Sequence, residues 1–433
     1  MLVLKGAKLI DGNGDVLKDA VVLIDGSRIK QVGSTFEVQV PEDAQVVDMG
    51  SCTLMPGLID CHMHIEAFNI LTTNNYRVAT FEVTPQLQML QSLLNAQICF
   101  EAGLTTLRTN GWIGYTGILT DETLAVRDAI DRGFVAGPRL KVAGWTTITG
   151  GHLDLILPGN APRRAGDFAD GPWELRKKVR ENTRKHVDLI KTCASGGGGT
   201  DKEAPDIRNM SQEELNAIVE EAHYFQKPVA CHCFTPVAQK MAVRAGVDTI
   251  EHCVFTDDEA IAMIKAENKP VVPTLAHRTD RAIEIRRRSG TSEFTLKKMK
   301  SLQPHTKETF QRIHQAGIKI AMGTDTQLDP EMGAQAIELE VYVEYGMTPM
   351  EAIQTATKNA AEALWLGKDL GTIEAGKLAD IIAVDGDPLA DIRVLQERKN
   401  IKMVMKEGRI FVDKRPGHEK YVIHDQTYGW QKL

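Results

Sequence analysis

Short apolar runs alternate with polar turns at both ends of the chain. Residues 2–10, 21–33 and 45–49 carry this pattern near the start, and similar runs return at 379–388 and 401–412. Alternating strands separated by Asp-Gly and Gly-Ser turns are typical of antiparallel sheets. Neither end has enough apolar residues for a core of its own. We therefore predict one small β-sandwich domain formed by residues 1–54 together with 369–433.

The middle of the chain, residues 55–368, alternates apolar strands with helical segments. Eight strand candidates are found at 58–65, 104–110, 139–147, 187–195, 228–234, 248–254, 269–275 and 318–325. Helical stretches lie between many of them, such as 211–226, where Ser211 and Glu214 have the spacing of a capping box. Eight β/α units in about 310 residues predict an α/β fold of the (β/α)8 TIM barrel type.

Composition narrows the class of protein. The 433 residues are 42% hydrophobic and 25% charged, with a formal net charge of -7, which is ordinary for a globular chain and argues against nucleic acid as a partner. The first residues have neither a basic nor an apolar leader region, so no secretory signal is expected. No run of about eighteen apolar residues predicts a membrane span. We expect a cytoplasmic protein that acts on a small molecule.

The cysteines do not predict disulfides. There are seven, an odd number spread thinly along the sequence. Cys61, Cys231, Cys233 and Cys253 each adjoin a histidine. Neighbours on a strand face opposite sides, so if these histidines face a site, the thiols face away from it. We expect the cysteines to be small buried apolar residues.

Residues of types that can bind or bridge metal ions lie at the ends of five predicted strands. They are His62 and His64 at the end of the first strand, Lys191 in the fourth, His232 in the fifth, His252 in the sixth and Asp325 in the eighth. Taken singly, a core histidine, a snorkelling lysine or an Asp that caps a helix would explain each of them. Active sites of barrels gather at the carboxyl ends of the strands, so all of these residues are expected to converge there. This convergence predicts a metal site.

These residues resemble the amidohydrolase superfamily over essentially the whole chain. The resemblance is carried by PGLIDCHMH at 56–64, by Lys191, His232 and His252, by GTD at 323–325 and by GTIEAGKLADIIAVDGDPL at 371–389. GGH at 150–152, IKTCASGG at 190–197 and HCFTP at 232–236 are similar to the branch of imidazolonepropionase-like and Xaa-Pro dipeptidase-like enzymes. That branch also contains hydrolases of xenobiotic amides, ureas and carbamates.

The resemblance implies a centre of two divalent metal ions. Lys191 would react with carbon dioxide to give a carbamate that bridges the two ions. One ion would be held by His62, His64, Lys191 and Asp325, and the other by Lys191, His232 and His252. Nitrogen and oxygen ligands without a thiolate favour Zn2+, with Mn2+ or Co2+ as alternatives.

The resemblance also implies hydrolysis by a metal-activated hydroxide. Asp325 would take the proton of the attacking water and pass it to the leaving nitrogen. His152 is the candidate for contact with the substrate carbonyl or oxyanion, with a purely structural role in ordering GGHLD as the alternative. The resemblance further implies a homo-oligomer.

Several positions bear on the substrate. Phe234 stands where dipeptidase-like relatives often have a tyrosine, and it cannot donate a hydrogen bond, so it favours an apolar substrate unless it serves packing alone. His277 and Arg278 follow the seventh strand and are candidates for gripping a carboxylate. The arginines at 286–288 are expected on a solvated helix face. Tyr115 is a candidate aromatic wall of the pocket, as are other aromatic residues near the ends of strands one to three.

Three functional hypotheses stay open. The leading one is hydrolysis of an amide, carbamate or urea C–N bond, with a lean towards apolar N-aryl or N-alkyl substrates. The alternative is an Xaa-Pro dipeptidase or an N-acyl-amino-acid amidohydrolase. A deaminase or cyclic imide hydrolase is less favoured, because deaminases of this superfamily commonly use one metal and lack the bridging lysine, whereas Lys191 is present. A scaffold without activity would be expected to have lost these ligands.

Overall fold

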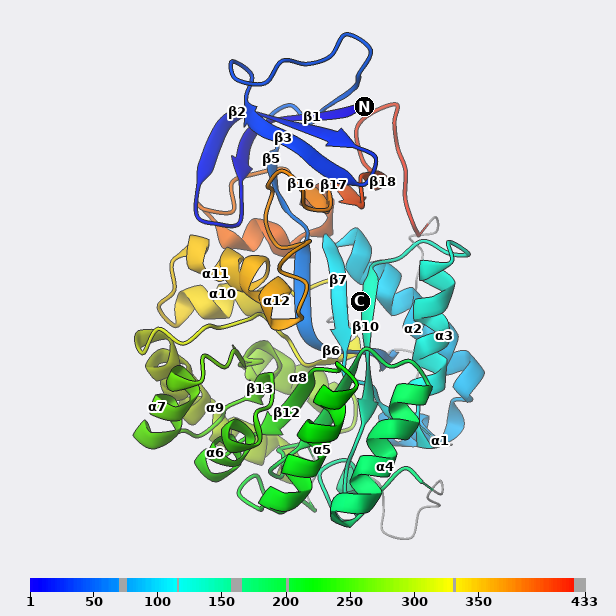
Figure 1. The fold of residues 1–433 in the computed structure, drawn as a ribbon, viewed down its shortest axis with the longest axis vertical. Helices are drawn as coiled ribbons and strands as arrows, with labels where there is room; N and C mark the ends of the chain where they lie inside the picture. Colours follow the sequence, from blue (N-terminus) through cyan, green and yellow to red (C-terminus); the bar gives the residue numbers. More distant parts are fainter. Residues whose placement is uncertain (70–75, 115–116, 157–165, 200–201, 330–331, 424–433) are drawn as a thin grey trace.

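Two sheets, each of eight strands, organise the chain. Figure 1 shows the sheet with β1, β2 and β3 above the strands and helices of the barrel. The computed structural model describes residues 1–69, 76–114, 117–156, 166–199, 202–329 and 332–423. One sheet combines both ends of the chain, and the other forms the barrel. Among the described residues, none of the helices combines the length and the apolar character needed to cross a bilayer.

The sheet of the chain ends unites segments far apart in sequence, as predicted. Its strands are β1 Leu2–Ile10, β2 Val16–Asp25, β3 Arg28–Ser34, β4 Gln45–Asp48, β5 Thr53–Pro56, β16 Ile381–Val384, β17 Ile401–Lys406 and β18 Arg409–Asp413. Leu4, Val22, Leu54, Ala383 and Met403 share one apolar cluster, so the two ends bury a common core. β5 runs past residue 54, so the predicted domain boundary falls inside a strand.

The pairing of β1 differs in part from the antiparallel expectation. β1 pairs antiparallel with β2, but it pairs parallel with both β4 and β5. The antiparallel prediction for residues 45–49 is therefore wrong. The physical reason is that β4 does not fold back on its predecessor as a hairpin. The chain crosses from β3 to the other side of β1 instead, and such a crossing yields a parallel neighbour.

The barrel strands are parallel and follow the order β14-β13-β12-β11-β10-β7-β6-β15. Their bounds are β6 Leu58–Asn69, β7 Leu104–Thr109, β10 Arg139–Trp145, β11 Leu189–Cys193, β12 Val229–Cys233, β13 Thr249–His252, β14 Val271–Val272 and β15 Thr326–Asp329. The first seven coincide with predicted strands. A separate short hairpin consists of β8 Ile113–Gly114 and β9 Gly117–Ile118.

The eighth predicted strand, residues 318–325, is irregular. Ile320 makes a single parallel bridge to Val271 on one side, and on the other the amide of Thr324 donates to the carbonyl of His62 at 3.0 Å. The segment therefore joins β14 to β6 and closes the barrel. Its close approach depends on Gly323, because a Cβ there would lie 2.3 Å from Val272 Cγ1. Strand pairing with β6 follows in β15, after the ligand candidate Asp325, and it includes a register shift between Thr326 and Leu328.

Helices surround the barrel (Figure 1). They are α1 Tyr76–Glu82, α2 Pro85–Glu101, α3 Thr120–Asp131, α4 Gly171–Arg184, α5 Gln212–Tyr224, α6 Pro236–Ala245, α7 Asp258–Ala266, α8 Asp280–Arg288, α9 Glu293–Gln315, α10 Ile337–Glu344, α11 Pro349–Thr355 and α12 Lys358–Ala363. Short 3-10 helices are η1 Asp154–Ile156, η2 Ala276–Arg278, η3 Ile392–Gln396 and η4 Arg398–Asn400. The predicted capping box of α5 is present, with Ser211 and Glu214 each bonding the other's backbone amide.

The terminal sheet packs where the barrel strands begin. The amide of Gly57 donates to the carbonyl of Asp380 at 2.9 Å, and Arg139 at the start of β10 forms ion pairs with Asp380 and Glu407. In Figure 1 the strands β6, β7 and β10 run away from this sheet. The carboxyl ends of the strands therefore gather on the far side, where the predicted metal ligands stand. All seven cysteines are free and buried, as predicted.

Candidate metal centre

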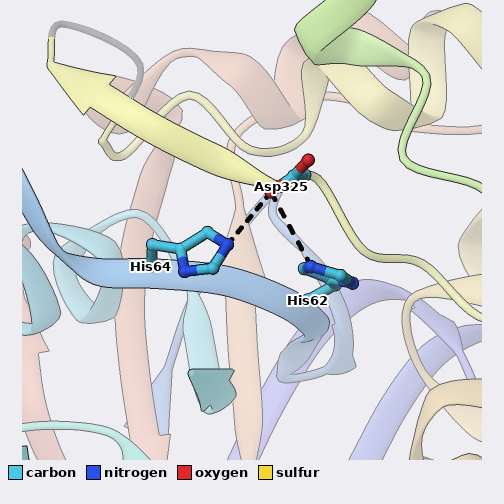
Figure 2. A group of neighbouring side chains, drawn as sticks. All are labelled: His62, His64 and Asp325. Atoms are coloured by element: carbon cyan, nitrogen blue, oxygen red, sulfur yellow. Dashed lines mark hydrogen bonds and ion pairs between the residues drawn. The ribbon is translucent and has the colours of Figure 1, made fainter. Parts of the chain in front are cut away.

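His62, His64 and Asp325 form a compact group of potential ligand atoms. Their candidate donor atoms lie within 4.8 Å of one another, and all three residues are buried. His62 and His64 project from the same side of β6 because they are two positions apart. Figure 2 shows both rings directed at Asp325, with His64 Nε2 at 3.1 Å and His62 Nε2 at 3.7 Å from its Oδ1.

Hydrogen bonds behind these rings set their orientation. His64 Nδ1 donates to the carbonyl of Gly111 at 2.6 Å, and His62 Nδ1 donates to Glu251 Oε2 at 2.6 Å. Burial opposes ionisation of Glu251, but the Arg108 guanidinium at 2.7 Å and His62 lower the pKa of this carboxyl to about 2. With Nδ1 engaged as a donor, each imidazole turns Nε2 towards the centre, as ligand histidines do.

The charges of this group suit a cation. Burial lowers the pKa of His62 to about 4, so its ring is neutral at pH 7 and Nε2 carries a lone pair. Burial would raise the pKa of Asp325, but His277 and His64 hold it well below its usual range. A lone pair therefore faces an ionised carboxylate. The two acceptor atoms, His62 Nε2 and Asp325 Oδ1, are 3.7 Å apart and repel each other unless a positive charge lies between them.

A second group stands beside the first. His232 is the penultimate residue of β12 and His252 is the last residue of β13. Their ring centroids are 4.5 Å apart, and the His252 ring is 4.8 Å from that of His62. Burial lowers the pKa of both rings well below the usual value. His252 Nδ1 bonds with Thr274 Oγ1 at 2.7 Å, which leaves Nε2 for a ligand. His232 donates from Nε2 to the carbonyl of Gly196 at 3.0 Å, which leaves Nδ1.

Lys191 on β11 completes the set of predicted ligands. Its side chain is buried, and its Nζ has no hydrogen-bond partner among the described residues. Burying an unpaired ammonium is costly, so proteins seldom bury this group without a partner or a modification. All six predicted ligands line the same pocket at the carboxyl ends of the strands.

Backbone geometry marks the same region. His252, Thr274 and Asp325 have positive φ values of 74°, 52° and 55°. Residues other than glycine seldom adopt this backbone conformation, and such strain concentrates at functional sites. Here it turns two ligand candidates and the hydrogen-bond partner of one of them towards the pocket.

His152 lies in the loop after β10 and lines the pocket. Its ring stacks on that of His232 with centroids 4.2 Å apart, and its Nδ1 donates to Glu203 Oε1 at 2.6 Å. The same oxygen accepts from the amide of Gly197 at 2.6 Å. A Cβ at Gly197 would lie 2.3 Å from His152 Cε1, so only glycine fits there. Sequence reasoning missed Glu203, because no local pattern connects it to His152.

Part of the pocket wall is apolar. Trp112, Trp145, Leu153, Met299 and Leu302 line it. Phe234 is 3% exposed, stacks on His232 with centroids 4.5 Å apart, and also packs against Leu302. It is therefore both a packing residue and part of the pocket wall. Tyr115, the other predicted aromatic contact, lies outside the described residues.

The predicted residues after the seventh strand reach the centre on η2. His277 Nε2 lies 3.4 Å from Asp325 Oδ2, and Arg278 places its Cζ 4.9 Å from the Phe234 ring centroid. Burial lowers the pKa of Arg278 to about 10. The backbone amides of Leu275 and Ala276 both donate to the buried carboxyl of Glu338, at 2.7 Å and 2.6 Å, which holds η2 in place.

Arg286 corrects the expectation of a solvated arginine run. Arg287 and Arg288 are exposed, as expected, but Arg286 is 8% exposed and lines the pocket. Its Nη2 donates to Gln327 Oε1 at 2.8 Å, and Gln327 Nε2 donates to Asp325 Oδ1 at 2.7 Å. The reason is the helical period, since adjacent residues of α8 point in different directions and only position 286 faces inward.

Several known proteins are similar to this chain in sequence and in fold. The Amidohydrolase family model matches residues 53–411. Ochratoxinase of Aspergillus niger is 33% identical over 94% of this chain and 86% of its own length. Imidazolonepropionase of Pseudomonas putida (strain GB-1) is 25% identical over 93% of this chain and 96% of its own length. The solved structure of a Xaa-Pro dipeptidase with bound methionine in the active site is similar with a TM-score of 0.85 and 31% identity, covering 95% of this chain and 99% of that chain.

Proposed function

The chain belongs to the amidohydrolase family, and from this premise we propose that it is a metal-dependent hydrolase that cleaves the C–N bond of an amide, carbamate or urea. The main support is the convergence of neutral imidazoles, an ionised carboxylate and an unpaired buried lysine in one pocket. The proteins that it resembles include an ochratoxinase and a Xaa-Pro dipeptidase.

We propose that His62, His64, Lys191 and Asp325 hold one divalent ion, and that Lys191, His232 and His252 hold a second. The donor set fits, because each imidazole has one ring nitrogen held by a neighbouring group and the other left for a ligand. The Lys191 amine has no hydrogen-bond partner among the described residues. Carboxylation of that amine by carbon dioxide would convert it into an anionic oxygen ligand. Nitrogen and oxygen donors favour zinc, with manganese or cobalt as alternatives. A divalent metal bound there activates water and polarises a carbonyl.

The surrounding residues supply positioning and proton transfer. Asp325 moves a proton from the attacking water to the leaving nitrogen, and Gln327 steadies its carboxylate through a hydrogen bond of 2.7 Å. His152 contacts the substrate carbonyl oxygen with the ring edge opposite Glu203, which holds Nδ1 at 2.6 Å. This arrangement favours a contacting role for His152 over a purely structural one.

The pocket wall supports a substrate with an apolar group, in line with Phe234, Trp112 and Leu302. An Xaa-Pro dipeptidase or an N-acyl-amino-acid amidohydrolase is the second candidate, favoured by the arginines beside the pocket and by the similarity to a Xaa-Pro dipeptidase. A deaminase or cyclic imide hydrolase is less favoured, since the buried Lys191 fits a bridging ligand.

The test is a screen of the protein reconstituted with Zn2+, Mn2+ or Co2+ against dipeptides, N-acyl amino acids, aryl amides, ureas and carbamates. We expect C–N cleavage in at least one class and two metal equivalents per chain. The Lys191→Ala variant should bind less metal, and Lys141→Ala, whose amine pairs with Asp188, serves as the control. One equivalent per chain that Lys191→Ala leaves unchanged would contradict the two-metal centre.

A further inference from the structure

Two arginines beside the candidate centre form no ion pair among the described residues. Arg278 is 4% exposed and Arg286 is 8% exposed. Within the described part of the chain, neither forms an ion pair with a carboxylate. Arg278 Nη1 donates to the carbonyl of Thr274 at 2.8 Å, but its Nη2 is buried without a hydrogen-bond partner in that same part. The one hydrogen bond described for the Arg286 guanidinium goes to a neutral amide, that of Gln327.

The buried Arg108 of the barrel is paired, since it lies 2.7 Å from Glu251. The partly buried Arg139 is paired as well, 2.7 Å from Asp380. A buried guanidinium without an anion is costly, and the cost of two of them close together is greater. When such groups line a pocket, a ligand is the source of the missing charge, and the planar guanidinium matches a carboxylate.

The position of these arginines indicates how far a bound anion would lie from the bond that is cleaved. Arg278 packs on Phe234, which stacks on the ligand candidate His232. Arg286 reaches the ligand candidate Asp325 through Gln327. Each guanidinium is therefore separated from the centre by one side chain. A carboxylate on the carbon next to the scissile nitrogen fits this short separation.

We propose that Arg278 and Arg286 form a carboxylate subsite, and that the substrate is an N-acyl derivative of an apolar amino acid. Its α-carboxylate lies at the two guanidiniums, and its side chain lies against Met299 and Leu302, which line the same pocket. The inference rests on the proposed C–N hydrolysis and specifies its substrate class. It reconciles the apolar wall with the buried positive charge, and it selects the acyl-amino-acid alternative over neutral amides and ureas.

The experiment compares two substrates that differ only in the carboxylate, N-benzoyl-L-leucine and N-(3-methylbutyl)benzamide, on the zinc-loaded protein. We expect kcat/KM to be about 10- to 100-fold higher for the acid, the range that a charge-assisted hydrogen bond provides. Arg278→Gln should remove most of this preference by slowing the acid alone, and Arg278→Lys should retain part of it. Arg287→Gln, an exposed neighbour on α8 paired with Glu284 and Glu293, is the control and should change neither rate.

Equal cleavage of the two substrates by the unmodified protein would overturn the subsite and leave the proposed C–N hydrolysis standing. An equal loss for both substrates in Arg278→Gln would mean that the arginine is structural, and would also overturn it. Binding of L-leucine and of 3-methylbutylamine, measured by calorimetry on the zinc-loaded protein, tests the subsite without turnover. Tighter binding of leucine that Arg278→Gln abolishes supports it even if neither amide is cleaved, whereas no preference for leucine overturns it.

Discussion

The two ends of the barrel treat buried charge in opposite ways. Where the strands begin, Arg139 donates to Asp380 at 2.7 Å and to Glu407 at 2.6 Å, so the terminal sheet neutralises it. Where the strands end, Lys191 Nζ and Arg278 Nη2 are buried without partners in the described structure. At one end the protein itself supplies the partners of the charged groups, whereas at the other end the charged groups are left for a ligand.

We infer that the paired charges at one end stabilise the fold, and that the unpaired charges at the other end serve binding or catalysis. A satisfied ion pair mainly holds two parts of the fold together, and removing one partner exposes the cost of burying the other. Unpaired groups lower stability, and they persist where binding or catalysis makes use of them. Arginines therefore have different expected roles at the two ends, and substitutions should reveal this.

Replacement of Lys191 by alanine should have the largest effect on activity. We expect kcat/KM of the metal-loaded protein to fall by about 1,000-fold or more, because a metal ligand would be lost. The metal-free protein should keep its melting temperature, because the amine has no hydrogen bond among the described residues. Steady-state kinetics and calorimetric melting test this. A variant that melts far lower would show that the amine stabilises the fold, and would weaken the contrast between the two ends.

Replacement of Arg139 by alanine should do the reverse. Asp380 would remain buried without its partner, so we expect the free energy of unfolding to fall by about 3 kcal/mol with kcat nearly unchanged. Urea unfolding monitored by circular dichroism measures the loss. Arg393→Ala, which removes an exposed pair with Asp391, is the control and should change stability by less than about 0.5 kcal/mol. A large loss of kcat in Arg139→Ala would contradict the division of roles.

Acid should destabilise the metal-free protein through the histidines at the site end. Burial lowers the pKa of His62 to about 4, and it also lowers the pKa values of His232 and His252. Below pH 6.5 the unfolded chain binds protons that the folded protein does not, so stability falls as the pH drops from 6.5 towards 4. The expected slope is about 1.4 kcal/mol per pH unit for each histidine.

Urea unfolding of the metal-free protein at pH 7.0 and 5.0 measures this dependence. His62→Gln should reduce the slope, whereas His223→Gln, a half-exposed histidine paired with Asp248, should change it less. A slope that His62→Gln leaves intact would place the acid sensitivity elsewhere in the protein.

Replacement of Glu203 by glutamine should have the smallest of these effects. The carboxylate orients His152 without lining the pocket, so we expect kcat to fall by about 10-fold, with KM, metal content and melting temperature retained. Glu203→Asp should restore part of kcat, and the exposed Glu213→Gln on α5 is the control. A fall in metal content would show that Glu203 supports the metal site itself.

The residues alone predicted much of the fold, because periodicity and turn chemistry act locally. Seven barrel strands, the α5 capping box and the joining of both chain ends in one sheet follow from such patterns. The parallel pairing of β1 with β4 and the irregular closure at Gly323 did not, because both depend on which segments meet across long stretches of chain.

The site divides in the same way. Strand position and residue type were enough to predict that one set of side chains lines a single pocket, since the carboxyl ends of parallel strands meet at one rim. These are His62, His64, Lys191, His232, His252 and Asp325. The partnership of Glu203 with His152 and the burial of Arg286 were decided only by tertiary structure. A hydrogen bond between distant loops, and the face that a helix turns to a pocket, depend on packing that no local pattern encodes.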